Sequence, residues 1–249
     1  MPIYIKSKEC YRIINKNIKY YVKDYMFFKP KTREELENTI KYFKYNKLFK
    51  KNDVFSSYYG QINYWNTVLI TDMSKLFYFI KDFNEDIESW DVSNVTNMES
   101  MFSNCIIFDK PLNDWDVSNV TNMKSMFCDC EKFNQPLNKW NVSKVENTKC
   151  MFNNCDNFNY PLNNWDVSNV KDMSFMFSYA IRFNQPLNDW NISKNVNIFH
   201  IFHHAYTFRQ DLSNWNINFN ELRHQHDPYF RKFKMMEMID MFLYNEEII

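Results

Sequence analysis

The sequence predicts an α/β repeat fold, a solenoid in which each 25-residue unit contributes one short strand and one short helix. The first observation is spacing, since all seven tryptophans lie 25 residues apart, at Trp65, Trp90, Trp115, Trp140, Trp165, Trp190 and Trp215. The second is a phrase, "WDVSNVTNM", that recurs with small changes from unit to unit. The third is a fixed set of apolar positions within each unit. Units that cannot bury their apolar sides alone must stack.

The helix of each unit is predicted from apolar spacing. In the second unit the apolar residues stand at i, i+3, i+4 and i+7, at Met98, Met101, Phe102 and Cys105. This spacing is typical of one face of a helix of about two turns. Thr96 and Glu99 have the spacing of a capping box at its start.

The strand is predicted around each tryptophan. Trp115 and Val117 alternate with polar residues, so both side chains are expected to point inward from a short strand. Pro111 lacks an amide hydrogen and suits the bend before the strand. Ser118 and Asn119 supply a turn after it.

Stacking of the units is expected to form one continuous core. Phenylalanines recur twelve and eighteen residues after the six tryptophans from Trp65 to Trp190, for example at Phe102 and Phe108. A small residue recurs fifteen residues after the five tryptophans from Trp90 to Trp190, and three of the six cysteines occupy this position, at Cys105, Cys130 and Cys155. We therefore expect ladders of aromatic rings, and small, reduced, buried thiols in place of disulfides.

The chain is divided into three parts. Residues 1–64 are predicted to hold a hairpin near positions 15–17 and a capping helix that starts at the Thr32–Glu35 capping box and runs to about Asn46, with Leu36, Ile40 and Phe43 on one face. Residues 65–215 form the repeats. Residues 216–249 are predicted to be a Met-rich C-terminal helical cap; the alternative is an exposed helix that binds a partner.

Composition limits the function. The chain has 30 basic and 30 acidic residues, so no overall field attracts nucleic acid or a membrane. Gly60 is the only glycine, which excludes phosphate-binding loops, dinucleotide fingerprints and nucleophile elbows. The first residues, "MPIYIKSKEC", lack the apolar run of an export signal, so we expect an intracellular, cytoplasmic protein.

Metal and catalytic chemistry are weighed against structural roles. His200, His203 and His204 have spacings that can chelate zinc, but they are expected on the solvent side of the sixth unit. Cys128 and Cys130 are too close in sequence for a usual zinc knuckle. Regular columns of carboxylates lack the contrast in environment that separates an acid from a base. We expect no enzyme activity, no cofactor and no metal.

The partner-binding surface is predicted beside the tryptophans. The residues directly after and directly before each tryptophan should face solvent if the strand alternates. The residue after tryptophan is expected mainly to hydrogen-bond turn amides, and the more variable residue before it to contact a partner. The candidate partner-binding residues are Ser89, Asp91, Asp114, Asp116, Lys139, Asn141, Asn164, Asp166, Asp189 and Asn191.

A protein partner is therefore expected, of unknown identity, and no membrane. The alternative is a nucleic-acid-associated protein that uses the basic N-terminal region. From position 1 to position 51 there are 14 Lys or Arg against 5 Asp or Glu, with aromatic residues such as Tyr20 and Tyr21 among them. A packed hairpin with solvated lysines explains the same residues, so we do not expect a nucleic-acid partner.

The repeat phrases resemble a known family. The run "FNQPLNDWNIS", the "WDVSNVTNM" phrases and "MF" before a small residue are similar to the BspA-type, or DUF285-like, repeat of bacterial and mycoplasmal surface proteins and of large DNA viruses. The resemblance covers about 28–215. It implies a right-handed leucine-rich-repeat-like solenoid that binds other proteins. The lack of an export signal and the Asn-, Lys- and Ile-rich composition favour a large DNA virus as the source, and then the host cytoplasm or the virion as the location.

Overall fold

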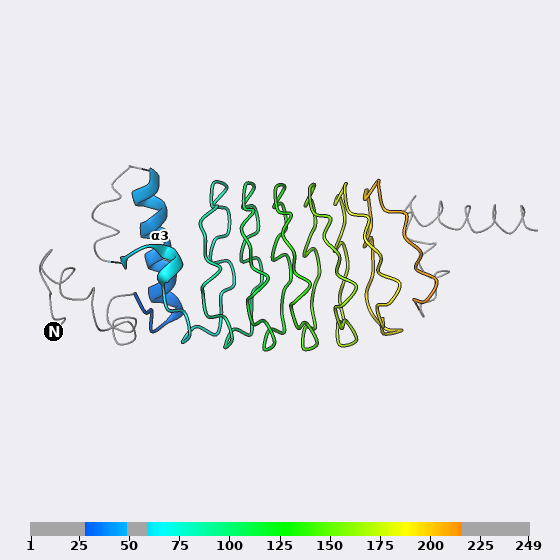
Figure 1. Cartoon of the computed structure of the whole chain (residues 1–249), viewed down its shortest axis with the longest axis horizontal. Helices are drawn as coiled ribbons and strands as arrows, with labels where there is room; N and C mark the ends of the chain where they lie inside the picture. Colours follow the sequence, from blue (N-terminus) through cyan, green and yellow to red (C-terminus); the bar gives the residue numbers. More distant parts are fainter. Residues whose placement is uncertain (1–27, 49–58, 216–249) are drawn as a thin grey trace, which may run out of the picture.

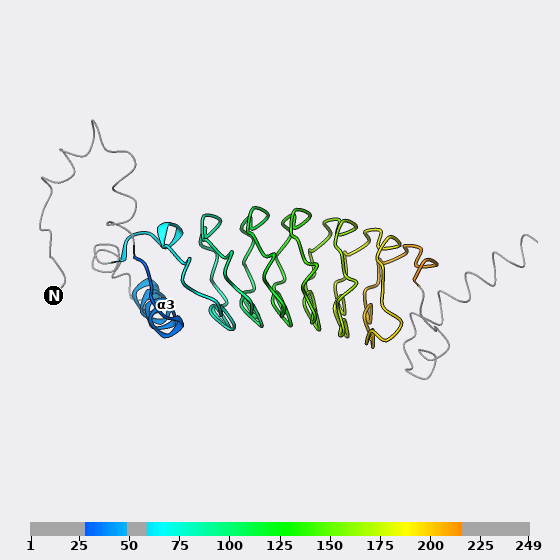
Figure 2. The same cartoon turned by 90° about the horizontal axis from the view of Figure 1, so that it is seen from below.

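The computed structural model describes residues 28–48 and 59–215, with the side chains of 45–48 left aside. The repeats form a row of similar coils that lie side by side, and a helix covers the N-terminal end of the row (Figures 1 and 2). We call this row the stack. Positions within a unit are numbered from its tryptophan, which is position 0, and the six complete units start at Trp65, Trp90, Trp115, Trp140, Trp165 and Trp190.

Regular secondary structure is scarce in the stack. The described residues contain the helix α3 (Arg33–Leu48), the 3-10 turn η1 (Ile62–Tyr64) and isolated parallel bridges between units, such as Asn97 with Asn122. Between 65 and 215 there is no α-helix and no sheet. The prediction of an α/β, right-handed leucine-rich-repeat-like solenoid, with one short strand and one short helix per unit, is therefore wrong. None of the helices in the described part is long and apolar enough to cross a bilayer.

Backbone angles explain why the predicted helices are absent. Ser100 and Asn104 have φ angles of 56° and 64°. Positions 10 and 14 have positive φ in all six complete units. A right-handed helix cannot pass through residues in this left-handed region.

Hydrogen bonds between units take the place of the helix. The amide of Met101 donates to the carbonyl of Met98 in the same unit at 3.2 Å, but the amide of Phe102 donates to Met126 in the next unit at 2.9 Å. In an α-helix both amides would bond to carbonyls four residues back. Carbonyls of the neighbouring unit accept hydrogen bonds from every second amide of this segment. The segment therefore forms a series of tight turns instead of a helix. The same apolar side chains still face inward, since Met98, Met101 and Phe102 are all fully buried.

The predicted strands are also replaced by turns. The amide of Trp115 donates to Leu112 at 3.1 Å, and that of Val120 donates to Val117 at 2.9 Å. These bonds join residues only three positions apart in the sequence, so they form turns and not the inter-strand ladder of a sheet. The inward orientation was predicted correctly, because Trp115 is 3% exposed and Val117 is 1% exposed.

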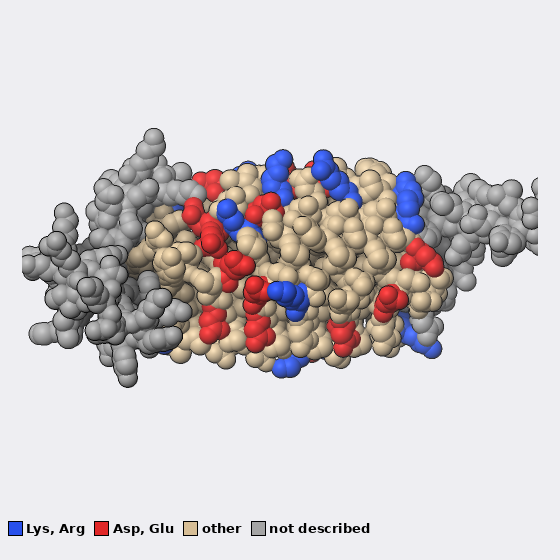
Figure 3. Space-filling view, in the orientation of Figure 1, with Lys and Arg blue, Asp and Glu red and all other residues tan. Residues whose placement is uncertain are grey.

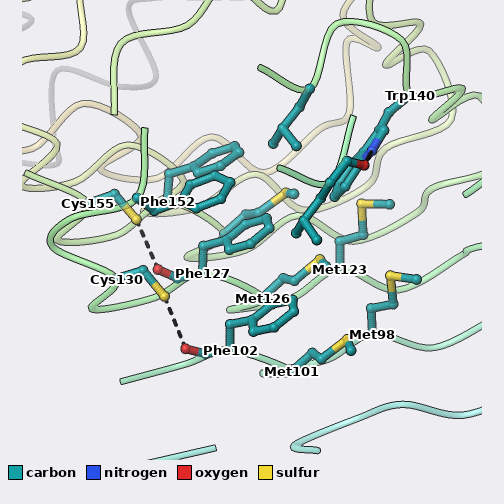
Figure 4. Close-up of a cluster of buried hydrophobic side chains, with 14 of the residues drawn as sticks. Met98, Met101, Phe102, Met123, Met126, Phe127, Cys130, Trp140, Phe152 and Cys155 are labelled. Carbon is teal, nitrogen blue, oxygen red and sulfur yellow. Dashed lines mark hydrogen bonds between the residues drawn. The ribbon is translucent and has the colours of Figure 1, made fainter. Parts of the chain in front are cut away.

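The core consists of aromatic ladders that run through the stack. The rings of Phe102 and Phe127 have centroids 5.5 Å apart and planes within 2°. The indoles of Trp190 and Trp215 lie 6.3 Å apart with parallel planes. Figure 4 shows Phe102, Phe127 and Phe152 one above another with the methionines beside them. The prediction that consecutive 25-residue units share one aromatic interior is confirmed.

Hydrogen bonds between neighbouring units, which we call polar rungs, run beside the aromatic ladders. The thiol of Cys130 donates to the carbonyl of Phe102 at 3.0 Å, as the dashed lines in Figure 4 show for this cysteine and for Cys155. At position 19, Asp109 accepts a hydrogen bond from the amide of Asn134, and Asn134 accepts one from the amide of Asn159, both at 3.0 Å. Such rungs satisfy backbone groups that would otherwise be left unpaired between coils.

The predicted N-terminal capping helix is confirmed as α3. Thr32 Oγ1 accepts a hydrogen bond from the amide of Glu35 at 3.1 Å. Leu36 and Ile40 are buried in the same core as the repeats, and Phe43 packs against it. The predicted hairpin near 15–17 and the predicted C-terminal helical cap at 216–249 lie outside the described residues.

Candidate interaction surface

All ten residues predicted to bind a partner are exposed. They form two columns on either side of the buried tryptophans. The first column, directly after tryptophan, consists of Asp91, Asp116, Asn141, Asp166 and Asn191. The second column, directly before tryptophan, consists of Ser89, Asp114, Lys139, Asn164 and Asp189.

The column after tryptophan mainly forms turns. Asp166 Oδ1 accepts hydrogen bonds from the amide and hydroxyl of Ser168 at 3.1 and 2.6 Å. Asn141 accepts the same pair from Ser143, at 3.1 and 2.7 Å. Such side-chain-to-backbone bonds stabilise tight turns. The prediction of turn chemistry is confirmed here, while Asn191 makes no such bond to the described residues.

Hydrogen bonding also changes the acidity of this column. The hydroxyl of Ser118, and then its amide, lower the pKa of Asp116 below its usual value. The hydroxyl and amide of Ser168 lower the pKa of Asp166 in the same way. In both cases burial acts in the opposite direction and is the weaker influence. The two carboxylates are therefore ionised at neutral pH, and each accepts hydrogen bonds from the serine two residues later in its own turn.

The column before tryptophan differs in charge and size from one unit to the next. Lys139 Nζ pairs with Asp114 of the preceding unit at 2.7 Å, and this hydrogen bond raises the pKa of Lys139. Both side chains are more than 60% exposed, so solvent and salt weaken the pair. Ser89 donates to the carbonyl of Asn63. The remaining members, Asn164 and Asp189, extend the exposed column toward the C-terminal end.

The described residues were also compared with the geometry of a metal site. Within residues 28–48 and 59–215, no group of three His, Cys, Asp or Glu side chains is arranged to hold a metal ion. His200, His203 and His204, which were predicted on the solvent side of the sixth unit, are half-buried. His204 Nδ1 lies 2.5 Å from the hydroxyl of Tyr206. The histidines are thus part of an aromatic cluster.

The thiols of the small-residue column are buried. Cys105, Cys130 and Cys155 have no exposed surface and form no disulfide. Burial raises the pKa of all three well above that of a free thiol. A thiol with a raised pKa is a poor nucleophile at neutral pH. The prediction of small, reduced, buried cysteines is confirmed for these three positions.

Sequence reasoning missed an aromatic cluster on the last two complete units. We call it the C-terminal aromatic patch; it contains Phe175, Tyr179, Phe199, His200, His203, His204 and Tyr206. Tyr179 is 44% exposed and Tyr206 is 58% exposed. The centroid of Tyr179 lies 4.6 Å from that of His204 in the next unit.

A signal for this patch was present in the sequence. Positions 10 and 14 hold small polar residues in the second unit, Ser100 and Asn104, but aromatic residues in the fifth unit, Phe175 and Tyr179. A departure from the repeat at a position outside the aromatic ladders changes the surface without changing the core. Comparing outward positions between units would have revealed the patch.

The distribution of charged side chains on the surface varies along the stack. Figure 3 shows acidic side chains gathered over the units nearest α3, with basic side chains along the upper margin. The basic N-terminal region, on which the nucleic-acid alternative depends, lies outside the described residues up to position 27. No described contact favours that alternative.

A family model matches most of the chain. The model described as "Mycoplasma protein of unknown function, DUF285" matches residues 43–159 and 137–242, which overlap and together span 43–242. The match includes every complete unit and exceeds half of the chain. No curated protein and no solved structure matches this sequence.

Proposed function

Because the chain belongs to the DUF285 repeat family, whose function is unknown, we propose that it is a non-catalytic scaffold that binds a partner protein. The observation that carries this proposal is a contrast between the inside and the outside of the stack. Inward positions repeat the same residue types in successive units. The exposed column before tryptophan changes from unit to unit.

The constant interior serves stability. Phe102, Phe127 and Phe152 are all fully buried and stack on one another. Replacing one rung would disturb the units on both sides of it, so the interior tolerates little variety. The function is accordingly sought on the outer surface.

The variable exterior suits recognition. Asp114, Lys139 and Asn164 occupy equivalent places in successive units, yet present a negative, a positive and a neutral group. The backbone of this column is bonded to the neighbouring unit, since the amide of Lys139 donates to Asn113 Oδ1 at 3.1 Å. A surface fixed in advance loses little conformational entropy on binding. A partner lying along the stack would meet a defined sequence of side chains.

The non-catalytic part of the proposal is supported by the side chains themselves. The described carboxylates next to the tryptophans are all exposed, so none of them lies in the buried, apolar environment that raises the pKa of a catalytic acid. General acid–base catalysis by a carboxylate pair depends on different environments for its two members. The buried thiols of Cys130 and Cys155 have raised pKa values, which disfavours a thiolate nucleophile.

The C-terminal aromatic patch is a second candidate face for the same function. Aromatic side chains contribute more than other residues to binding energy at protein interfaces. Tyr179 and Tyr206 combine an exposed ring with a hydroxyl group. The patch therefore offers an anchor that the polar columns lack.

Site-specific photo-crosslinking in the native host tests the proposal. A photoreactive residue is placed at Asp114, Asp189 or Tyr179 of the full chain, and at exposed Lys132 as the control. We expect one protein to be captured from at least one of the first three sites and not from position 132. Capture from position 114 must be lost when Asp189→Lys is added, capture from position 189 when Asp114→Lys is added, and capture from position 179 when Tyr206→Ser is added. Equal yields from all four sites would show that neither face is a binding surface.

Intracellular location and a viral source stay predictions, because no described residue bears on either.

A further inference from the structure

Two cysteines of the described residues lie outside the small-residue column. Cys128 is at position 13 of the third unit, and Cys150 is at position 10 of the fourth. Both are free thiols and both are half-buried, whereas Cys130 of the small-residue column is fully buried. Described units stand on both sides of each of these residues along the stack. Core packing therefore does not account for the two thiols.

Stacking places the two cysteines on neighbouring turns. Cys150 and Asn153 are the ends of one tight turn in the fourth unit, in which the amide of Asn153 donates to the carbonyl of Cys150 at 3.2 Å. Such a turn brings its end residues within about 7 Å of each other. The Sγ atom of Cys128 is 3.7 Å from Asn153 Oδ1, and the amide of the next residue, Asp129, donates to the carbonyl of Asn153 at 2.9 Å. Cys128 therefore lies beside the turn that begins at Cys150.

Ser125 connects the same two residues from the other side. Its carbonyl accepts the amide of Cys128 at 3.2 Å, and its amide donates to the carbonyl of Lys149, the residue before Cys150, at 2.8 Å. Ser125 and Cys150 occupy position 10 of successive units, and Cys128 and Asn153 occupy position 13. These four residues are the corners of two stacked turns, and the cysteines occupy one diagonal.

The surroundings favour Cys150 as the thiol that reacts first. Burial is the largest influence on both thiols and raises both pKa values. The carboxylate of Asp129 raises the pKa of Cys128 further, and the charge of Cys150 acts in the same direction. The next largest influence on Cys150 is the charge of Lys149, which lowers its pKa. The thiolate, which is the nucleophile in disulfide exchange, therefore forms more readily at Cys150.

We propose that Cys128 and Cys150 form a reversible disulfide that links the third and fourth units when the protein meets a low-molecular-weight disulfide such as oxidised glutathione. The thiolate of Cys150 attacks one sulfur of oxidised glutathione, and one glutathione leaves as its thiolate. The thiolate of Cys128 then attacks the Cys150 sulfur of this mixed disulfide, and the second glutathione leaves. The two glutathione thiolates take up the two protons that the protein thiols lose. The two cysteines are thereby oxidised, and oxidised glutathione is reduced.

This modification site goes beyond the proposed scaffold function and does not depend on it. The two cysteines are at positions 10 and 13, whereas the columns of candidate partner-binding residues lie beside the tryptophans. The disulfide would join one coil to the next through a covalent bond. A cross-link restricts the unfolded chain, so the oxidised protein should unfold at a higher urea concentration than the reduced protein. Dithiothreitol should reverse this difference.

Thiol mapping of the unaltered full chain tests the proposal. The folded protein is incubated with oxidised glutathione, the remaining thiols are alkylated, and the peptides are analysed by mass spectrometry without reduction. We expect one crosslinked pair that joins Cys128 to Cys150 within one molecule and is lighter by two hydrogen atoms than the separate thiol peptides. Crosslinks of either residue to any other cysteine, or between molecules, would overturn the proposal.

A serine variant isolates the first step. Cys128→Ser should accumulate one glutathione on Cys150, because the thiol that completes the exchange is missing. Near-ultraviolet circular dichroism of the tryptophans shows whether the stack is folded in this variant and in the unaltered chain. If Cys150 of the folded, unaltered chain keeps its glutathione and no crosslink forms, the proposal fails. It fails equally if neither thiol of the folded chain reacts.

A matched pair of serines provides a control for the geometry. Ser103 and Ser125 stand one unit earlier in the same relation, at position 13 of the second unit and position 10 of the third. In a chain that lacks the native pair, Ser103→Cys with Ser125→Cys should form the equivalent crosslink. Ser100→Cys with Asn153→Cys, two units apart, should form none. Equal crosslinking of both engineered pairs would show that large movements of the coils, and not the stacked turns, bring thiols together, and the proposal would be overturned.

Discussion

The indole nitrogen of Trp140 donates a hydrogen bond to the carbonyl of Leu112, 28 residues earlier in the chain, at 2.8 Å. The same carbonyl accepts the amide of Trp115 at 3.1 Å. Each tryptophan is therefore both a ring in the core ladder and a polar link to the turn that leads into the tryptophan of the neighbouring unit. The bond repeats from Trp90 to Trp215 with distances between 2.8 and 3.2 Å.

Trp140→Phe tests the polar part of this link. The substitution keeps an aromatic ring but removes the donor, so we expect a loss of about 1–3 kcal/mol in the free energy of unfolding. Urea unfolding followed by circular dichroism measures it. The exposed control, Asn164→Ala, should change stability by less than about 0.5 kcal/mol. Equal stability of the two variants would mean that the indole bond contributes nothing.

Phe127→Ala should cost about 3–5 kcal/mol, because the ring is fully buried between Phe102 and Phe152. Asp116→Ala removes an exposed turn residue and should cost no more than about 1 kcal/mol. Thermal and urea unfolding of both variants provide the comparison. The reverse order would show that the inward and outward faces have been assigned wrongly.

Substitutions at Ser125 test the positions with positive φ. The φ angle of Ser125 is 54°, and its amide donates to the carbonyl of Lys149 at 2.8 Å. Valine is strongly disfavoured in this region, whereas glycine adopts it freely. We expect Ser125→Val to be less stable than Ser125→Gly by about 1–2 kcal/mol. Denaturant midpoints of the two variants at the same site decide the matter. A valine variant as stable as the glycine variant would be incompatible with positive φ at this position.

Asp166→Asn tests the acid sensitivity of the turns. The lowered pKa of Asp166 means that its ionised form stabilises the folded state above the pKa of the unfolded chain. That stabilisation is lost as the pH falls through the folded-state pKa. Asparagine should preserve the turn, because Asn141 forms the same bonds to Ser143.

Unfolding free energies of the unaltered chain and of Asp166→Asn should therefore converge as the pH falls from about 6 to about 3. Urea titrations at several pH values follow this difference. A difference that stays constant, or that grows in acid, would show that the Asp166 carboxylate gains nothing from Ser168.

The candidate surface was predictable only in part. Exposure of Asp114 and Asp189 follows from their place beside a buried tryptophan, and it was predicted from alternation alone. The C-terminal aromatic patch was not predicted, because Tyr179 and His204 are 25 residues apart and meet only through stacking. The repeat pattern describes only the residues that most units share, so it does not show residues such as Tyr179 and His204 that occur in single units.

The sequence by itself determined the period, the identity of the buried columns, the exposure of the columns beside tryptophan and the N-terminal helix α3. These depend on local spacing and on side-chain polarity, which do not require knowledge of neighbouring units. Only the tertiary structure decided the backbone within each unit. Spacing of i, i+3, i+4 and i+7 suits both a helix and a series of tight turns, and Met98, Met101 and Phe102 are buried in either. The choice depended on whether an amide such as that of Phe102 bonds within its own unit or to Met126 of the next, and only stacking brings that second carbonyl within reach.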